Sequence, residues 1–274
     1  MTVLPSLFLA HGAPDLVISD HTAKRFLNRL ADLLPRPRAI LIISAHWETT
    51  TTALTTAVAP STVHDFTGWP SSLYELSYPA HTDATLIERT KALLDTAGVP
   101  VIEDAVRGYD HGAWVPLLLS YSDAEIPVVQ LSMLRGSNTK QQFSFGQALA
   151  PLRQEGVLII GSGATVHNLY EMSPEGTPAP DWAEGFDQWL FDCIERRNLE
   201  ALLRFPAEPI TAQRAHPSIE HFLPIYLAMG AGWDGGFARR LHHSYSYGSI
   251  GMACYAFGHS TDTTIAPIKE RFKT

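Results

Sequence analysis

The chain has 274 residues, of which 45% are hydrophobic, and it carries a formal net charge of −8. A chain of this length and composition can bury a sizeable core, which excludes a disordered protein. The negative charge, without any run of lysine or arginine, offers no electrostatic basis for binding nucleic acid or an anionic membrane. The composition therefore predicts a globular protein with neither of those partners.

The cysteines and the first residues indicate a cellular compartment. The chain has two cysteines, Cys193 in a predicted helix and Cys254 in a predicted buried strand. Their spacing fits neither a disulfide framework nor a zinc site. The first ten residues lack a basic segment, and their apolar part meets His11 too early for a signal peptide or a membrane span. We expect a soluble, cytoplasmic protein.

Short apolar runs alternate with helical patterns along the chain. The runs have the length of strands buried on both faces, and they lie at residues 6–10, 39–44, 127–133, 156–161 and 251–257. Amphipathic helices are predicted at 19–35, 83–98 and 181–198, because apolar residues recur there every three or four positions. Ser19 or Asp20 is expected to cap the first helix, and Gly98 to end the second.

This alternation favours an α/β fold with a central, largely parallel or mixed sheet flanked by helices. The sequence shows no linker, so residues 1–274 are expected to form a single domain. The stretch 48–82 has the composition of an irregular loop, and such long loops often shape a binding site.

Three histidines follow predicted strands. His11 comes directly after the run 6–10, and His46 after the run 39–44. The run 156–161 leaves its strand through two glycines and reaches His167 a few residues later. Ligands of open α/β sheets bind beyond the carboxyl ends of the strands, so these side chains are expected to meet at one edge of the sheet.

Two more histidines lie where helices are expected to begin. Residues 216–230 have the pattern of a helix start, with Pro217 in the first turn and Glu220 and His221 within that turn. His111 stands at another junction between a loop and a helix. Helix N-termini can direct a side chain into a crevice, so both histidines join the candidates.

Histidines gathered in this way have the chemistry of a metal site. Neutral imidazole binds zinc and ferrous iron, and three protein ligands leave coordination positions open for reactants. The spacing forms no compact motif such as HExxH or CxxC. A hydrogen-bonded structural role at the end of a strand is the alternative for each of His11, His46 and His221.

Other residues near these histidines are candidates for substrate contact. His64 and His216 are intermediate candidates for lining the site, while Trp47 and Trp114 can stack on a ring or belong to the core. The remaining histidines are expected at the surface or in satisfied polar roles: His21, His81, His242, His243 and His259. Arg107 and Arg135 are candidates for a substrate carboxylate, with plain exposure as the alternative.

Two common catalytic templates do not fit. In the segment 161–163 (GSG), Ser162 lies directly between two glycines, which is not the GxSxG spacing of a nucleophile elbow. The same segment lacks the third glycine of GxGxxG, because Val166 stands there. The sequence thus disfavours a serine hydrolase and a dinucleotide-dependent enzyme.

Seven segments, in order and spread over nearly the whole chain, resemble one known family. They are LFLAHGAP, PRPRAILIISAHWE, STVHDFTGWP, LYELSYPA, YDHGAWVPLLLSYSDAEIPVVQLSM, GVLIIGSGATVHNL and HPSIEHFLPIYLAMGA. In these residues the sequence is similar to the class III, LigB-type extradiol ring-cleavage dioxygenases, specifically their DOPA-dioxygenase branch. The resemblance implies an α/β domain with one non-haem metal.

The resemblance also implies roles for individual histidines. His11, His46 and His221 match the metal-ligand positions of the DOPA branch. His167 matches the acid–base catalyst, which in some zinc-loaded members also approaches the metal, and His111 matches a second histidine near the substrate. The wider class uses two histidines and a glutamate, so Glu220 is the alternative to, or the support of, His221.

The implied reaction joins a DOPA-like catechol to O2. Fe(II) is expected for turnover, whereas Zn(II) can occupy the same ligands in an isolated protein. A metal-dependent hydrolase that uses the same histidines is the alternative, and a non-catalytic binding protein is a second. The physiological catechol stays open, as does assembly into a homo-oligomer.

Overall fold

The computed structural model describes residues 3–234 and 236–258. Five strands fall where apolar runs predict them: β1 (Ser6–Ala10), β2 (Ala39–Thr49), β5 (Val128–Leu134), β6 (Val157–Gly163) and β10 (Cys254–Gly258). Three more complete the main sheet: β3 (Thr52–Thr55), β4 (Val101–Asp104) and β7 (Phe237–His242). A separate hairpin joins β8 (Tyr245–Ser246) to β9 (Ile250–Gly251).

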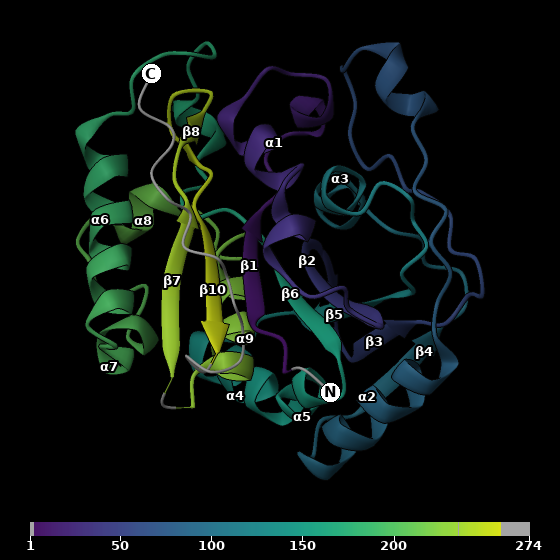
Figure 1. Cartoon of the computed structure of the whole chain (residues 1–274). Coiled ribbons are helices and arrows are strands. Elements are labelled where there is room, and N and C mark those ends of the chain that lie inside the picture. Colours follow the sequence, from purple (N-terminus) through teal and green to yellow (C-terminus); the bar gives the residue numbers. More distant parts are fainter. Residues whose placement is uncertain (1–2, 235, 259–274) are drawn as a thin grey trace.

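The main sheet is mixed, with its parallel strands at the centre. Its order is β4-β3-β5-β2-β6-β1-β10-β7 (Figure 1). The strands β5, β2, β6 and β1 run parallel to one another, whereas β10 is antiparallel to both β1 and β7. The parallel register pairs Ala10 with Gly163 and Ser44 with Ser162. The residues that follow these strands therefore emerge at one edge.

Helices cover both faces of this sheet (Figure 1). The longer ones are α2 (Ala84–Thr96), α3 (His111–Ser120), α4 (Thr139–Leu149), α6 (Asp181–Glu195) and α9 (Leu223–Gly232). The shorter ones are α1 (Thr22–Leu27), α5 (Pro151–Gln154), α7 (Leu199–Leu203) and α8 (Ala212–Ala215). Within the described ranges, none of these helices combines the length and the apolar character needed to cross a membrane.

The alternation of side chains along each strand separates two hydrophobic cores. Phe8 of β1 enters the core shared with α2, α4, α6 and α9, whereas its neighbours Leu7 and Leu9 enter the core shared with α1 and α3. Successive side chains of a strand point to opposite faces, so a sheet covered on both sides needs apolar residues at every position. This explains why the central strands are continuous apolar runs and confirms the predicted α/β class.

Two of the predicted helices are confirmed, although they end two and three residues earlier than predicted, at Thr96 and Glu195. The helix α2 begins after Asp83, whose carboxylate accepts hydrogen bonds from two backbone N–H groups, and it is followed by Gly98 at a φ of 72°. The helix α6 buries Phe186 and Leu190, as the spacing predicts. Cys193 in α6 and Cys254 in β10 are buried free thiols.

The single helix predicted over 19–35 is wrong. The structure has α1 and then a separate 3-10 helix at Leu30–Leu33, and the cap of α1 is the Nδ1 atom of His21 rather than Ser19 or Asp20. A turn after Leu27 divides the two pieces, and both Leu27 and Leu30 are fully buried. The apolar spacing therefore predicted correctly which residues are buried, but it did not show that the helix is interrupted.

Two predicted boundaries near the site also need correction. The strand β2 continues to Thr49, so His46 lies within the strand, where the pairing with β5 shifts register between Ile43 and Glu48. The helix α9 begins only at Leu223, so Pro217 and His221 lie in turns before it. Pro224 occupies the first helical turn instead, where its missing N–H costs no hydrogen bond.

The stretch 48–82 is not entirely irregular. It contains β3, which pairs with β4 and β5, and a 3-10 helix at Ser71–Glu75. The sequence analysis did not predict the strands β3, β4 and β7 or the helix α4. For β4 and β7 the reason is that they are only partly buried and lack a continuous apolar run.

The structure shows why glycine stands at positions 12 and 163. Gly12 adopts a φ of 65°, the left-handed conformation that lets the chain turn sharply after β1. Gly163 instead permits a close approach, because a Cβ atom there would lie 2.0 Å from the backbone oxygen of His221. That oxygen accepts a hydrogen bond from Ala164 N at 2.9 Å, which fastens the segment before α9 to the end of β6.

We predict that Gly163→Ala destabilises the fold by about 1–3 kcal/mol, because the added methyl group collides with backbone rather than with a flexible side chain. Gly185→Ala in α6 is the matched control, since no atom lies within 4 Å of the position that its methyl group would take. The control should be neutral or slightly stabilising, by about 0.5–1 kcal/mol. Urea unfolding midpoints compare the variants, and equal midpoints would contradict the packing argument.

Candidate metal centre

Three imidazole rings meet beyond the carboxyl ends of the central strands. The Nε2 atom of His46 lies 3.1 Å from Nε2 of His11 and 3.2 Å from Nε2 of His221. The three residues form one of the groups whose ligand atoms all lie within 4.8 Å of one another, a geometry that can hold a metal ion. His11 and His221 are buried, and His46 is half-buried.

The other ring nitrogen of His11 fixes its tautomer. Its Nδ1 atom lies 3.0 Å from the hydroxyl oxygen of Ser162, and that hydroxyl donates its single hydrogen to the backbone oxygen of Gly112. Ser162 must therefore accept the hydrogen of Nδ1, because a hydroxyl has only one hydrogen to give. The Nε2 atom of His11 is left with a lone pair facing the centre.

Carboxylates lie beside the outer nitrogens of the other two rings. The Nδ1 atom of His221 lies 3.0 Å from Oε1 of Glu220, within hydrogen-bond distance, whereas the Nδ1 atom of His46 faces Oδ2 of Asp65 at 3.6 Å, beyond that distance. A carboxylate can only accept a hydrogen, so it favours the tautomer with hydrogen on Nδ1. Histidine ligands of metals typically have this second partner, which fixes the ring and raises its basicity.

Burial keeps these rings uncharged. It lowers the pKa of His46 to about 4, with help from His111, although Asp110 and Asp65 act in the opposite direction. It also lowers the pKa of His11 and His221 well below 6.5, and the neighbouring histidines lower them further. Neutral imidazoles are the form that binds metals.

The donor set fits a metal ion. The Nε2 atom of His46 lies 3.1 and 3.2 Å from those of the other two rings, and unprotonated nitrogens at such distances repel one another unless a cation lies between their lone pairs. Bonds of about 2.0–2.1 Å to a metal place two nitrogens of a tetrahedral site about 3.3 Å apart, close to the separations here. The chemistry of the donors and their spacing therefore agree with a single histidine-bound metal.

His167 and His111 flank the three rings. The ring of His167 stacks on that of His221 with centroids 3.5 Å apart and an angle of 8° between the planes. The ring centroid of His111 lies 3.9 Å from that of His46. Burial lowers the pKa of His167 to about 4, while Glu220 raises it and His111 lowers it. All five predicted histidines are thus brought together.

A buried carboxylate positions the helix that begins at His111. Asp110 is fully buried and caps α3 through Ala113 N. Its oxygens also accept hydrogen bonds from the hydroxyl of Ser44 at 2.6 Å and from the guanidinium of Arg107 at 2.7 Å. Ser44 Oγ accepts in turn from the backbone N–H of His46. Asp110 therefore links the start of α3 to the strand segment that carries His46.

Asp65, in the loop after β3, holds His111. Its Oδ1 atom accepts hydrogen bonds from the backbone N–H of His111 at 3.0 Å and from Nδ1 of the same residue at 2.8 Å. Burial raises the pKa of Asp65, but the hydrogen bonds and charge of His111 outweigh it and bring the pKa to about 2. Asp65 is therefore ionised and keeps hydrogen on Nδ1 of His111.

The five histidines line a cavity of about 310 Å³. Its remaining walls are mostly apolar and come from loops and from the β8–β9 hairpin: Gly12, Ala13, Pro14, Phe66, Trp69, Ala164, Leu169, Met172, Tyr247 and Ile250. A mostly apolar cavity with a few convergent polar groups is typical of a small-molecule site. The volume suits a ligand built on one aromatic ring.

Three residues considered for substrate contact lie outside this lining. Trp114 is fully buried and donates its indole N–H to the backbone oxygen of Val63, and Trp47 is buried beneath Arg107. His64 bonds to the backbone oxygen of Leu76. Their role in substrate binding stays a prediction that the cavity does not support.

The histidines expected in satisfied roles have partners of their own. His21 caps α1 and also contacts the backbone oxygen of Tyr245, and His243 pairs with Asp187 at 3.2 Å. His216, a candidate for lining the site, is instead buried among aromatic rings, 2.8 Å from the backbone oxygen of Thr165 and outside the cavity lining. His259 lies outside the described residues.

Sequence reasoning missed the residues that orient the histidines. Ser162 was weighed only as a nucleophile, yet it anchors His11, and its glycine neighbours allow the chain before α9 to approach. Asp65 and Asp110 were not singled out, although the first follows His64 and the second precedes His111 in the sequence. An acidic residue next to a candidate ligand is the signal that could have found both.

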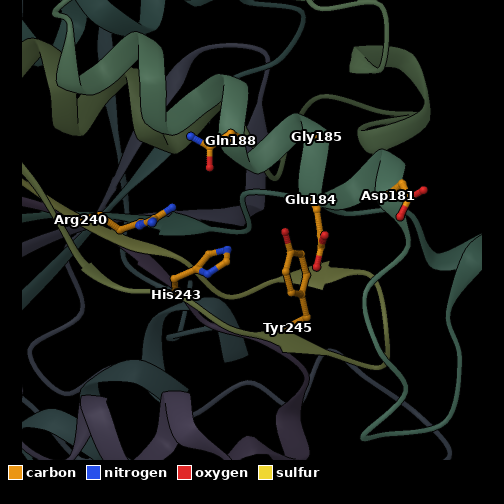
Figure 2. Close-up of a pocket in the computed structure, with 7 residues that line it drawn as sticks. All are labelled: Asp181, Glu184, Gly185, Gln188, Arg240, His243 and Tyr245. Atoms are coloured by element: carbon orange, nitrogen blue, oxygen red, sulfur yellow. The ribbon is translucent and has the colours of Figure 1, made fainter. Parts of the chain in front are cut away.

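A second cavity, of about 440 Å³, lies between α6 and the chain around β7. Figure 2 shows Glu184 and Gln188 on the helix, facing Arg240, His243 and Tyr245 across the cavity. It is larger than the cavity lined by five histidines, but among the described residues that line it His243 is the one histidine, and it is paired with Asp187. The chemistry of the metal centre therefore lies elsewhere.

The fold and the site together define an α/β protein with a histidine cluster suited to one non-haem metal beside an apolar cavity. The family described as "Catalytic LigB subunit of aromatic ring-opening dioxygenase" matches residues 8–258. The chain therefore belongs to the LigB family of aromatic ring-opening dioxygenases.

Individual relatives agree with this assignment. The chain is 38% identical over 256 residues to a "4,5-DOPA dioxygenase extradiol" of Beta vulgaris, covering 92% of this chain and 96% of the relative. It is 38% identical over 243 residues to an Escherichia coli (strain K12) protein of the same name, covering 85% and 87%. A crystal structure of an uncharacterized protein from E. coli K12 superposes with a TM-score of 0.79 at 32% identity, covering 93% of this chain and 100% of that chain.

Membership of this family establishes the class of reaction. The protein is an extradiol-type, ring-cleaving dioxygenase, which acts on a small aromatic molecule and O2 and uses a non-haem metal. The alternative of a metal-dependent hydrolase is not favoured.

We predict that Asp110→Asn destabilises the protein by about 3 kcal/mol, because it removes one partner of a buried, hydrogen-bonded ion pair. Asp123→Asn is the matched control, since Asp123 pairs with Arg36 at the surface. Exposed pairs contribute about 0–1 kcal/mol, so the control should change little. Thermal and urea unfolding measure both, and equal losses would contradict the role assigned to Asp110.

Proposed function

We propose that the protein opens the ring of a DOPA-like catechol with O2 at one Fe(II) ion held by His11, His46 and His221. The observation that carries this proposal is the convergence of three Nε2 atoms at the wall of an apolar cavity. The names of the relatives support a catechol of the DOPA type.

The choice of iron rests on redox chemistry. When bound, ferrous iron supplies the one-electron chemistry that lets O2 react with an electron-rich ring, which zinc lacks. Three protein ligands leave room for both catechol oxygens and O2. Zn(II) suits the same imidazoles, so an isolated protein loaded with zinc should bind catechol without turnover.

Glu220 supports His221 rather than replacing it in this proposal. Its carboxylate lies 3.0 Å from Nδ1 of His221, on the side of the ring away from the cluster. Glu220 also belongs to a group with His167 and His221 whose ligand atoms lie within 4.8 Å of one another. We propose that Glu220 keeps hydrogen on Nδ1 of His221 and that His167 stays outside the ligand set.

His167 is the proposed acid–base catalyst. Its ring lies on that of His221 and lines the cavity, and its nitrogens have no hydrogen bond to any described residue. They can therefore accept a proton from a catechol hydroxyl and return it as the ring opens. Burial lowers the pKa of His167 to about 4, so the ring is neutral and has a nitrogen available to accept a proton.

His111 is the proposed partner of a substrate oxygen. Asp65 holds hydrogen on Nδ1 of His111, so Nε2 is the nitrogen that can exchange a proton or a hydrogen bond with the substrate. The neighbouring carboxylate also stabilises a positive charge on this ring. His111 can thus balance negative charge on a catechol oxygen.

The proposal extends to the whole chain and its compartment. We propose that residues 1–274 act as one catalytic domain, since both cores continue through the single main sheet. The two buried free thiols support a reducing, cytoplasmic environment.

We predict that His11→Ala abolishes stoichiometric metal binding without unfolding the sheet. Losing one of three ligands removes most of the affinity, whereas His11 stands after β1 and outside its ladder with β6. Metal content after iron loading, together with far-ultraviolet circular dichroism, checks both parts. His81→Ala, at an exposed histidine, is the control, and retained metal in His11→Ala would refute the ligand assignment.

We predict that His167→Ala lowers kcat for catechol-dependent oxygen uptake by roughly 10²-fold or more, the scale of a positioned acid–base group. Iron content should stay at the level of the unmodified protein, because His167 is outside the proposed ligand set. An oxygen electrode and a yellow ring-opened product give the readout. A hydrolase would instead form product equally well under nitrogen, and a binding protein would lose nothing on substitution.

A further inference from the structure

His46 differs from the other two proposed ligands in how its ring is held. Side-chain partners at the outer nitrogens fix the rings of His11 and His221. No described residue forms a hydrogen bond with Nδ1 of His46, since Asp65, the carboxylate that faces it, is 3.6 Å away. The position of this ring therefore depends on the backbone that carries it.

That backbone lies in a bulge of β2. The register of β2 with β5 passes from Ile43 directly to Glu48, so that residues 44–47 lie opposite residue 132 alone. A bulge turns a side chain to a new direction and leaves backbone groups without partners in the ladder. The N–H and C=O groups of His46 therefore need partners from side chains.

Two side chains supply those partners. The N–H group of His46 donates to Oγ of Ser44 at 3.1 Å, and its C=O group accepts from Nη2 of Arg107 at 3.4 Å. Both partners also bond to Asp110, since Ser44 Oγ donates to Oδ1 at 2.6 Å and Arg107 Nη2 donates to Oδ2 at 2.7 Å. Asp110 is fully buried. One carboxylate therefore anchors both groups that hold the backbone of His46.

The guanidinium of Arg107 contacts the bulge at a second point. Its central carbon lies 5.3 Å from the ring centroid of Trp47, the buried residue that follows His46. The backbone N–H of Arg107 donates to Oδ1 of Asp104 at 2.8 Å, which fixes the start of the side chain at the end of β4. A planar guanidinium stacks on an aromatic ring and offers several N–H donors in one fixed plane, whereas an ammonium group is a compact charge on a flexible stem.

Arg107 lies outside the cavity. It does not belong to the described residues that line the cavity, and its charge is paired with that of Asp110. Arg135, the other arginine considered for a substrate carboxylate, donates to the backbone oxygen of Glu48 and is also absent from the lining. Arg107 therefore reaches the metal centre only through the segment that carries His46.

We propose that Arg107 is a positioning residue, which sets the place of the metal ligand His46 by holding the bulge of β2. This inference rests on the proposed function, since it takes His46 as a ligand. The Nε2 atom of His46 lies 3.1 and 3.2 Å from those of the other two rings, so a shift of this residue would disturb the whole set. Loss of the guanidinium should therefore weaken metal binding without unfolding the protein.

Arg107→Lys is the first test. Lysine keeps a positive charge beside Asp110, so the unfolding midpoint in urea should stay close to that of the unmodified protein. It lacks the plane that stacks on Trp47 and donates to His46, so the dissociation constant of Co(II) should rise roughly 10- to 100-fold, the scale for groups that orient metal ligands. Competition with a chelator under nitrogen measures this constant, and the visible absorption spectrum of bound Co(II) should report an altered coordination.

Arg38→Lys is the matched control. Arg38 also donates to a carboxylate, that of Asp83 at 3.2 Å, and to a backbone oxygen, that of Glu155 at 2.6 Å. It lies just before β2 begins, at the end of the strand opposite to His46. The control should keep the Co(II) affinity and the spectrum of the unmodified protein.

A second variant removes the ion pair without leaving a buried charge unpaired. Arg107→Met combined with Asp110→Asn removes both charges together, and asparagine can still accept the hydrogen bond of Ser44. Its Co(II) dissociation constant should exceed that of Asp110→Asn alone by roughly tenfold, because only the double variant lacks the guanidinium.

The outcomes separate the role of Arg107 from the proposed function. Unchanged Co(II) affinity in both Arg107 variants would overturn the positioning role, and so would an equal loss in Arg38→Lys. If His46→Ala loses Co(II), the ligand assignment stands whatever the Arg107 variants show. If His46→Ala binds Co(II) as tightly as the unmodified protein, His46 is not a ligand, and the proposed site and the role of Arg107 are both refuted.

Discussion

The fold brings three imidazole nitrogens together in a buried place, with Nε2 of His46 at 3.1 Å from that of His11 and at 3.2 Å from that of His221, where their lone pairs repel one another. Such an arrangement is unfavourable by itself, so the fold must impose it. Ser162 and Glu220 do so by occupying the outer nitrogens of His11 and His221, and the parallel strands bring their ends together. A cation is the group that turns this repulsion into attraction.

The carboxylates around the histidines mainly fix the orientation of the segments that carry them. Asp110 joins α3 to β2 through Ser44, and Asp65 joins the preceding loop to His111. These bonds connect segments that are 46 to 66 positions apart in the chain. A catalytic geometry assembled from distant segments needs such rigid links, because small displacements of a reacting group are costly.

The central strands and His11, His46 and His167 could be predicted from sequence, because buried parallel strands are continuous apolar runs and their carboxyl ends share one edge. His111 and His221 were found instead from the patterns of helix starts. The helix over 19–35 could not be predicted correctly, since the apolar spacing is the same for one helix and for two short ones that bury Leu27 and Leu30. The positions of His46 and His221 were also imprecise. A register shift in β2 and the turns before α9 arise from tertiary packing, which leaves no local signal.

The hairpin of β8 and β9 supplies Tyr247 and Ile250 to the cavity but none of the histidines. Its residues come from a different part of the chain than the strands that end at His11 and His167, and they pair with each other outside the main sheet. This part of the cavity wall can thus vary while the histidine cluster stays unchanged. Such a division allows a family to acquire new substrates by altering one hairpin, with its chemistry and its folding core intact.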